Sequence, residues 1–89
     1  YKTKDNRWIL PVVNEYERYW RPFCQAVGAQ EIIDDPRYCT KQATFDPKNR
    51  EDCIRYFEDC FSKLNADEVL PKLEAIDILK ITTPANRLL

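Results

Sequence analysis

The sequence contains no histidine and only one glycine, Gly28, among its 89 residues. Without histidine, neither a Ser–His nor a Cys–His nucleophile–base pair can form, and a zinc site loses its usual nitrogen ligand. A single glycine also excludes the glycine-rich loops with which P-loop and Rossmann proteins hold phosphates. These absences remove the most familiar enzyme sites from consideration.

Long apolar runs and an excess of basic charge are also missing. The longest apolar run extends from Trp8 to Val13, far short of the roughly 20 residues that span a bilayer. The formal net charge is −1, so no positive field attracts nucleic acid or an anionic membrane. We therefore expect neither of these as a partner. The chain starts with Tyr1 rather than Met, and we expect it to come from a longer polypeptide.

Four cysteines are present, and the sequence favours free thiols. Cys24, Cys39, Cys53 and Cys60 lie among aromatic residues, where a reduced thiol behaves as a small hydrophobic group. Cys53 and Cys60 fall on one expected helix about 10 Å apart, too far for a disulfide. No C-x-x-C pair occurs, so we predict no metal site. Reduced thiols favour a cytoplasmic protein, with a disulfide-stapled secreted domain as the alternative.

The order of hydrophobic patterns predicts a single small α+β domain over residues 1–89. Residues 1–13 are expected to form a β-hairpin with its turn at Lys4-Asp5-Asn6, because Asp and Asn tolerate the left-handed backbone. Pro11 places the second arm at a sheet edge or ends its pairing. A late short strand over residues 78–82 alternates its side chains and is a candidate to join the same sheet.

Two to three amphipathic helices are expected between these strands. Asn14 is a candidate cap for the first, and Pro22 predicts a kink or a fresh start near Arg21. Gly28 is placed where a left-handed C-cap ends the helix. Apolar residues at spacings of three and four predict a buried stripe, formed by Tyr16, Tyr19, Trp20, Phe23, Cys24 and Val27.

The clearest helix starts after a connection that includes the turn Asp35-Pro36-Arg37. Asp46 is its N-cap and Pro47 its first helical residue. Asn65 caps a third helix over residues 66–75, within which Pro71 favours a bend. The buried stripe predicted for the longer helix consists of Cys53, Ile54, Phe57, Cys60, Phe61 and Leu64.

The abundant acidic and aromatic side chains have structural interpretations. Glu51 and Asp52 are neighbours on a helix and point in different directions, so they do not form a general acid–base pair. The helical spacing of the aromatic residues favours a core over a stacking platform for nucleic-acid bases. The pattern alone therefore assigns no catalytic residue.

Several separated motifs are more specific. Residues 1–8 read Y-K-T-K-D-N-R-W, residues 18–28 contain R-Y-W-x-x-F-C before Gly28, residues 34–40 read D-D-P-R-Y-C-T, and Asn49-Arg50 stands at the start of the long helix. In this order, the motifs resemble the small domain of the family III CoA-transferases, most closely members that act on aromatic or branched acids. Asn6 stands where that family usually has glycine, a replacement that the turn permits.

The resemblance implies part of an acyl-CoA transferase, an enzyme that moves coenzyme A between carboxylic acids. In that family a large Rossmann-like domain supplies the catalytic aspartate, and two chains interlock as a homodimer. No segment here matches that region, so the resemblance implies no catalytic residue in this chain and no activity for it in isolation. The implied partners are the rest of the parent chain, acyl-CoA and a carboxylic acid. Coenzyme A enters as a thioester substrate, with no covalently bound cofactor, and this domain forms one wall of the cleft.

Glu15 is the one candidate substrate-binding residue. In the racemase branch of the family a glutamate after the second strand approaches the active site, and Glu15 corresponds to it. The favoured alternative is a first-turn carboxylate that the helix dipole stabilises. A second functional hypothesis, from another class, is a self-standing helical module that binds a protein partner through an aromatic groove.

Overall fold

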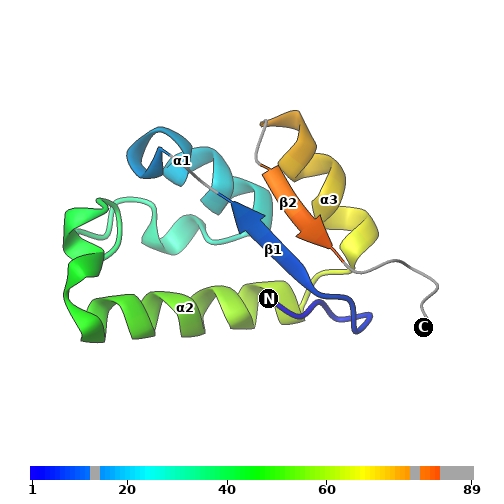
Figure 1. Cartoon of the computed structure of the whole chain (residues 1–89), viewed down its shortest axis with the longest axis horizontal. Coiled ribbons are helices and arrows are strands. Elements are labelled where there is room, and N and C mark those ends of the chain that lie inside the picture. Colours follow the sequence, from blue (N-terminus) through cyan, green and yellow to red (C-terminus); the bar gives the residue numbers. More distant parts are fainter. Residues whose placement is uncertain (13–14, 77–78, 83–89) are drawn as a thin grey trace.

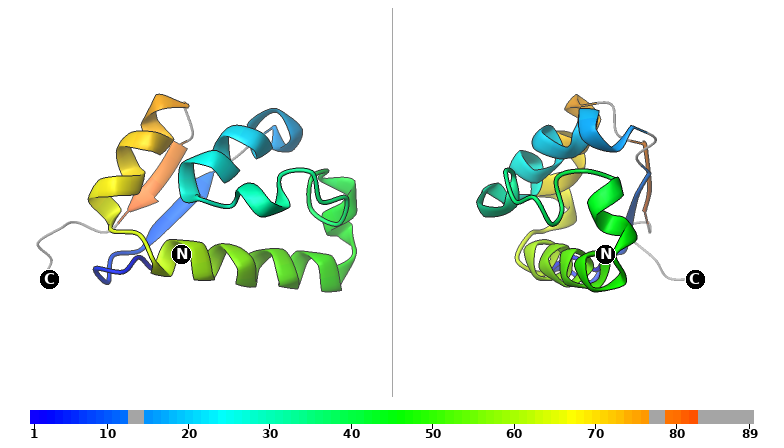
Figure 2. Two further views of the ribbon diagram at one scale, coloured as in Figure 1. Left: turned by 180° about the vertical axis from the view of Figure 1, so that it is seen from behind. Right: turned by 90° about the vertical axis from the view of Figure 1, so that its left-hand side faces the viewer.

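The computed structural model describes residues 1–12, 15–76 and 79–82. Two strands, three α-helices and two short 3-10 helices occur in these ranges, in the order β1 (Ile9–Val12), α1 (Tyr16–Val27), η1 (Gln30–Ile32), η2 (Gln42–Phe45), α2 (Pro47–Ser62), α3 (Ala66–Ala75) and β2 (Leu79–Thr82). The strands form an antiparallel pair on one side of the helices (Figures 1 and 2). The predicted α+β class is confirmed.

The predicted hairpin is present as a tight turn closed by a single bridge between Lys2 and Trp8. Asn6 adopts φ 64°, the left-handed conformation that the turn requires. The Lys4 N–H donates to the Leu64 carbonyl at 2.8 Å, and the Asp5 carboxylate accepts from the backbone N–H of the first residue of α3 at 3.1 Å. The turn is thus bound to the α2–α3 connection, and backbone hydrogen bonds between Tyr1 and Ile9 and from Thr3 to Arg7 join the two arms.

β1 continues through Pro11 and pairs with β2 along its whole length, from Ile9 opposite Thr82 to Val12 opposite Leu79. In a two-stranded sheet each strand is an edge, where a proline is tolerated because one side of the strand has no ladder to complete. The edge position predicted for this strand is therefore confirmed, and its pairing does not end at the proline. The predicted late strand is also confirmed, apart from residue 78, which lies outside the described residues.

α1 is one continuous helix, so the predicted fresh start near Arg21 is wrong, whereas a kink at this point stays a prediction. Pro22 lies inside the helix and removes one backbone donor from it. Trp20 before the proline and Phe23 and Val27 after it are buried in one core. Tertiary packing of this face, rather than intrinsic propensity, keeps the two halves of the helix in register.

The two ends of α1 differ in how far the sequence predicted them. Asn14, the predicted cap, lies outside the described residues, and Glu15 occupies the N-cap position. Gly28 adopts φ 78° and its N–H donates to the Cys24 carbonyl, so the left-handed C-cap is confirmed.

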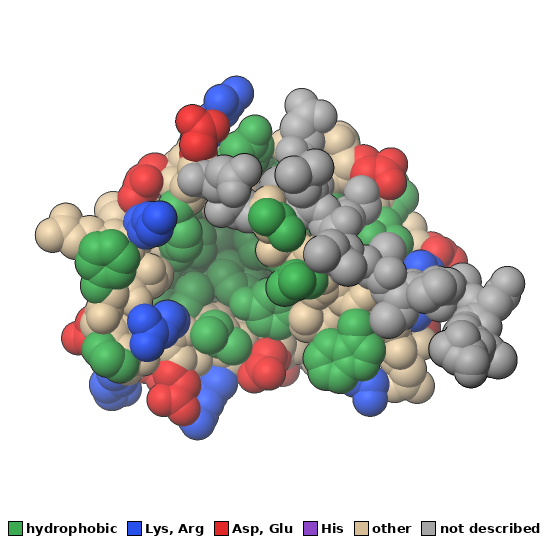
Figure 3. All heavy atoms as spheres, in the orientation of Figure 1, with side chains coloured by type: hydrophobic (Ala, Val, Ile, Leu, Met, Phe, Trp, Pro, Cys, Tyr) green, Lys and Arg blue, Asp and Glu red, His purple; other side chains and the backbone are tan. Residues whose placement is uncertain are grey.

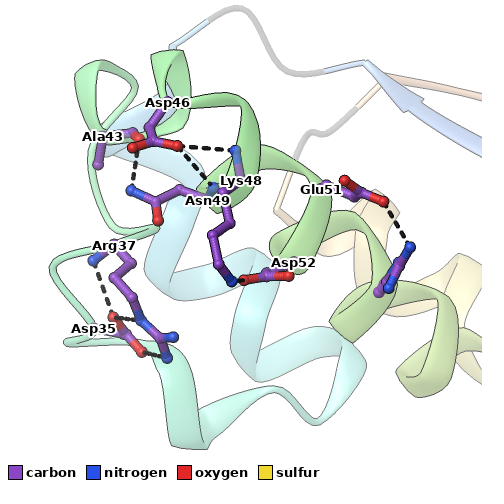
Figure 4. A network of polar contacts seen from close by, with 9 residues as sticks. Asp35, Arg37, Ala43, Asp46, Lys48, Asn49, Glu51 and Asp52 are labelled. Atoms are coloured by element: carbon purple, nitrogen blue, oxygen red, sulfur yellow. Dashed lines mark hydrogen bonds and ion pairs between the residues drawn. The ribbon is translucent and has the colours of Figure 1, made fainter.

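α2 begins as predicted. The Asp46 carboxylate accepts hydrogen bonds from the N–H groups of Lys48 and Asn49 at 2.9 and 3.4 Å, and Pro47 is the first helical residue. The Asn49 side-chain amide donates to the Ala43 carbonyl at 3.1 Å, which attaches η2 to the helix (Figure 4). The start of α2 is therefore fixed by two side chains, that of the N-cap Asp46 and that of Asn49 in the first turn.

The core lies between the three helices and the inner side of β1. Its rings interlock: Tyr1 stacks on Phe61 with centroids 4.8 Å apart, and Phe23 meets Phe57 edge-on at 5.1 Å. Ile54, predicted in the buried stripe of α2, is instead 44% exposed, because it lies at the edge of that stripe next to a groove. The largest fully buried side chains are Phe61, Ile9, Leu73, Val69 and Cys24.

Candidate functional site

The two central motifs, residues 18–28 and 34–40, form one structural unit. The Trp20 indole Nε1 donates to the Ile33 carbonyl at 2.8 Å, and the Tyr16 hydroxyl donates to the Tyr38 carbonyl at 2.6 Å. Both donors belong to α1 and both acceptors to the loop that follows it. The two rings pack against their neighbours, while the hydroxyl of Tyr16 and the indole N–H of Trp20 bond to the loop. Together these contacts hold the loop against the helix.

Charged contacts close the same unit at the surface. The Arg21 guanidinium of α1 pairs at 3.0 Å with the carboxylate of Asp34, the first residue of the D-D-P-R motif. Arg37 binds Asp35 through its backbone N–H and its guanidinium, which lowers the pKa of that carboxyl (Figure 4). Since both arginines are engaged in these pairs, the motif serves the loop's own structure.

A groove of about 320 Å³ lies between α1 and α2. Figure 3 shows a hollow on this face whose floor is formed by hydrophobic side chains. The α1 wall consists of the aromatic residues Tyr16, Tyr19, Trp20 and Phe23. The hydrogen bonds that Tyr16 and Trp20 donate to the loop, called here the aromatic latch, therefore also set the position of this wall.

The opposite wall comes from the first half of α2, with Arg50, Cys53, Ile54 and Phe57. Tyr1, Pro11 and Thr44 complete the lining. Among the described residues that line the groove, Arg50 is the one with a charged side chain. No ion pair or side-chain hydrogen bond joins its guanidinium to another residue in the described part of the chain, and the side chain is exposed. The groove is thus an apolar trough with one available cation.

The thiols near the groove are not activated. Burial raises the pKa of the Cys24 thiol to about 12 and that of the Cys53 thiol to about 11. A thiol with such a pKa carries almost no thiolate at neutral pH, so neither is a nucleophile. All four cysteines are free in the structure.

Two other classes of site are absent from the described ranges. No group of His, Cys, Asp or Glu residues there is arranged to hold a metal ion. No helix within those ranges has the length and apolar character needed to cross a membrane.

Glu15, the candidate from sequence, lies at the N-cap of α1 and outside the lining of the groove. Its carboxylate pairs with Arg18 at 2.9 Å, and both side chains are exposed. The structure does not bring Glu15 together with Arg50. Its role in substrate binding therefore stays a prediction.

Sequence reasoning missed Arg50 as a site residue. Asn49-Arg50 entered only as part of a family motif, whereas the structure gives Asn49 to the η2 contact and Arg50 to the groove. The signal was available in the spacing. Arg50, Cys53, Ile54 and Phe57 follow the i, i+3, i+4, i+7 pattern of one helix face, which places a charge at the end of an apolar row.

Comparison with known proteins agrees with the order of the motifs. The sequence model of CoA-transferase family III matches residues 1–86. The chain is 27% identical over 78 residues to (R)-2-hydroxy-4-methylpentanoate CoA-transferase of Clostridioides difficile. The matched region covers 88% of this chain and 19% of that protein. The chain therefore spans about a fifth of the length of this relative. No solved structure matches it. Because the family match extends over nearly every residue, the chain belongs to CoA-transferase family III.

Proposed function

We propose that residues 1–89 form the small domain of an acyl-CoA transferase and supply one wall of its acyl-CoA cleft. The family match over residues 1–86 is the observation that carries this proposal. A large Rossmann-like domain of the same parent chain supplies the catalytic aspartate, and two parent chains form an interlocked homodimer. The substrates are an acyl-CoA thioester and a carboxylic acid, and this chain supplies no nucleophile of its own.

The outer side of β1 supports contact with another part of the enzyme. Side chains alternate along the strand: Ile9 is 1% exposed, whereas Trp8 and Leu10 are each 56% exposed and Val12 is 36% exposed. Apolar side chains that gather on an exposed surface mark a contact site. We assign the surface of Trp8, Leu10 and Val12, called here the outer face of β1, to contact with the large domain.

Glu15 is retained in this proposal as a residue that contacts substrate in the assembled enzyme. It is exposed and follows the outer face of β1 in the chain. A domain that covers this face therefore lies close to Glu15. Substitution Glu15→Gln tests the assignment, since loss of the charge should weaken acyl-CoA turnover if this carboxylate meets the substrate, and unchanged turnover would remove Glu15 from the site.

The proposal is tested with the protein expressed together with the sequence that flanks these residues in its gene. Transfer of CoA from acyl-CoA donors to carboxylic acids is measured by chromatography of the thioesters. We expect transfer, and we expect Leu10→Glu to abolish it by disrupting the outer face of β1. Phe45→Glu is the matched control, because Phe45 is equally apolar and 67% exposed on η2. A protein without transfer activity toward any acyl donor, or without an aspartate nucleophile, would refute the proposal.

A second candidate function is a self-standing module that binds a protein partner through the aromatic groove. The four aromatic side chains that α1 gives to the lining support it. Hydrogen exchange on the 89-residue chain separates the two functions, because local stability differs between dependent and autonomous units. Weak protection of the amides near both ends favours a domain of a larger enzyme, whereas strong protection there favours the autonomous module.

A further inference from the structure

We propose that the groove between α1 and α2 binds a short carboxylic acid with a branched or aromatic hydrocarbon tail, and that Arg50 pairs with its carboxylate. The part played by this acid in CoA transfer rests on the proposed function, whereas its binding to the groove does not.

The walls of the groove fit a compact hydrocarbon tail. The Tyr16 and Trp20 rings stack with centroids 5.4 Å apart and an interplanar angle of 15°, so each ring covers one face of the other and the pair forms a rigid aromatic wall on the α1 side. Phe57 meets Trp20 nearly at a right angle, with centroids 5.8 Å apart, and forms the corner with α2. A rigid apolar wall with a corner gives a branched chain or a ring an apolar surface to cover, which removes the tail from water.

The size of the groove limits its occupant. Ligand pockets usually measure about 300–1,000 Å³, and this groove, at about 320 Å³, lies at the lower end. A small organic acid fits this space, whereas coenzyme A, with its nucleotide and long arm, does not. One cation also falls short of the several that a group of phosphates requires. The CoA portion of any thioester must therefore be held outside the groove.

Three polar groups of the lining are already engaged. The Tyr16 hydroxyl and the Trp20 indole donate to the loop carbonyls described above, and the Thr44 hydroxyl donates to the Lys41 carbonyl at 2.6 Å. The Tyr1 and Tyr19 hydroxyls of the lining make no hydrogen bond within the described residues, and they offer a ligand neutral groups only. An anionic group, in contrast, finds the planar fork of a guanidinium, which matches a carboxylate with two parallel hydrogen bonds.

The carboxylates nearest in sequence do not compete for Arg50. Asp52 pairs with Lys48 at 3.1 Å, and Glu51 pairs with Arg55 at 2.6 Å (Figure 4). Asp46 accepts the N–H bonds that cap α2. Each acidic group around Arg50 on α2 is thus engaged elsewhere, which leaves its positive charge for a ligand at the rim.

The test measures binding by calorimetry to the protein that carries its natural flanking sequence, with 4-methylpentanoate as the probe. We expect Arg50→Gln to weaken binding at least tenfold, because one charge-assisted contact of this kind is lost. Arg50→Lys should recover part of the affinity. Arg55→Gln is the matched control, since Arg55 is an exposed arginine of the same helix that does not line the groove. Circular dichroism confirms that each variant is folded.

Two further ligands separate the contributions of charge and tail. The neutral analogue 4-methylpentanamide should bind to the unsubstituted protein at least tenfold more weakly than the acid, and acetate should bind weakly because it lacks the tail. Equal binding of the acid to the Arg50→Gln and Arg55→Gln variants, or no binding of the acid at all, would overturn the inference. Binding of the acid by a protein that transfers no CoA would overturn the proposed function alone.

Discussion

Replacement of Trp20 by Phe tests whether the aromatic latch between α1 and the following loop holds the site together. Trp20 is 7% exposed, and its indole N–H is the donor to the Ile33 carbonyl. Phenylalanine retains an aromatic ring but has no donor. The substitution therefore leaves a buried carbonyl without its partner and reduces the buried ring area.

The expected loss can be worked out from these two effects. An unsatisfied buried acceptor costs about 1–3 kcal/mol, and the smaller ring adds roughly 1 kcal/mol, so the free energy of unfolding should fall by about 2–4 kcal/mol. A chain of 89 residues has a total of about 4–13 kcal/mol at the usual stability per residue. The substitution thus removes a large part of the stability.

Urea unfolding followed by circular dichroism at 222 nm measures this loss without depending on tryptophan fluorescence. Trp8→Phe is the matched control, because the chain has two tryptophans and Trp8 is 56% exposed. We expect the control to change the free energy of unfolding by less than about 0.5 kcal/mol. In the Trp20→Phe protein, amide exchange should also accelerate in residues 33–40. Similar losses for the two variants, or an unchanged exchange rate in the loop, would refute the latch.

Three further predictions concern the core, the start of α2 and the thiols. Phe61→Ala should lower the free energy of unfolding by about 3–5 kcal/mol, because Phe61 is fully buried. The control Phe45→Ala should change it by less than about 0.5 kcal/mol, because Phe45 is exposed. Comparable losses for the two variants in urea melts would contradict the burial of Phe61. Asp46→Ala should cost about 0.5–2 kcal/mol by removing the N-cap, and a thermal melt should show that Asp46→Asn recovers most of it. Burial raises the pKa values of Cys24 and Cys53 to about 12 and 11. These folded-state pKa values exceed the unfolded-state value of about 8.5. The free energy of unfolding therefore keeps its full value below about pH 8.5. It should fall by about 1.4 kcal/mol per pH unit for each thiol as the pH rises toward the folded-state values. Urea melts from pH 7 to 10.5 should show this fall, with a smaller slope in Cys24→Ala, and a flat profile would contradict it.

Elements fixed by local chemistry were predictable from the sequence. Gly28 ends α1, and Asp46 with Pro47 begins α2, because a cap depends on a few adjacent residues. The span of α3 was also predicted in full. The order of the elements then allowed the late strand to be assigned to the sheet of β1.

Features that depend on distant contacts were not predictable in the same way. Pro22 predicts a break, yet burial of Trp20 and Phe23 on the same face keeps α1 continuous. The turn of the hairpin is fixed by a bond from Lys4 to the α2–α3 connection, some sixty residues away, which no local pattern reveals. Arg50 becomes a site residue only when α1 packs opposite it, since a helix face alone does not reveal what it faces.

The most direct test of the account measures steady-state CoA transfer by the protein with its natural flanking sequence and by its Arg50→Gln and Arg55→Gln variants. We expect transfer to a branched carboxylic acid such as 4-methylpentanoate, with a KM for the acid at least tenfold higher in Arg50→Gln and unchanged in Arg55→Gln. The KM for the acyl-CoA donor should rise less than the KM for the acid, because the CoA portion of the donor lies outside the groove. Absence of CoA transfer in the unsubstituted protein would contradict the central claim that this chain is the small domain of an acyl-CoA transferase.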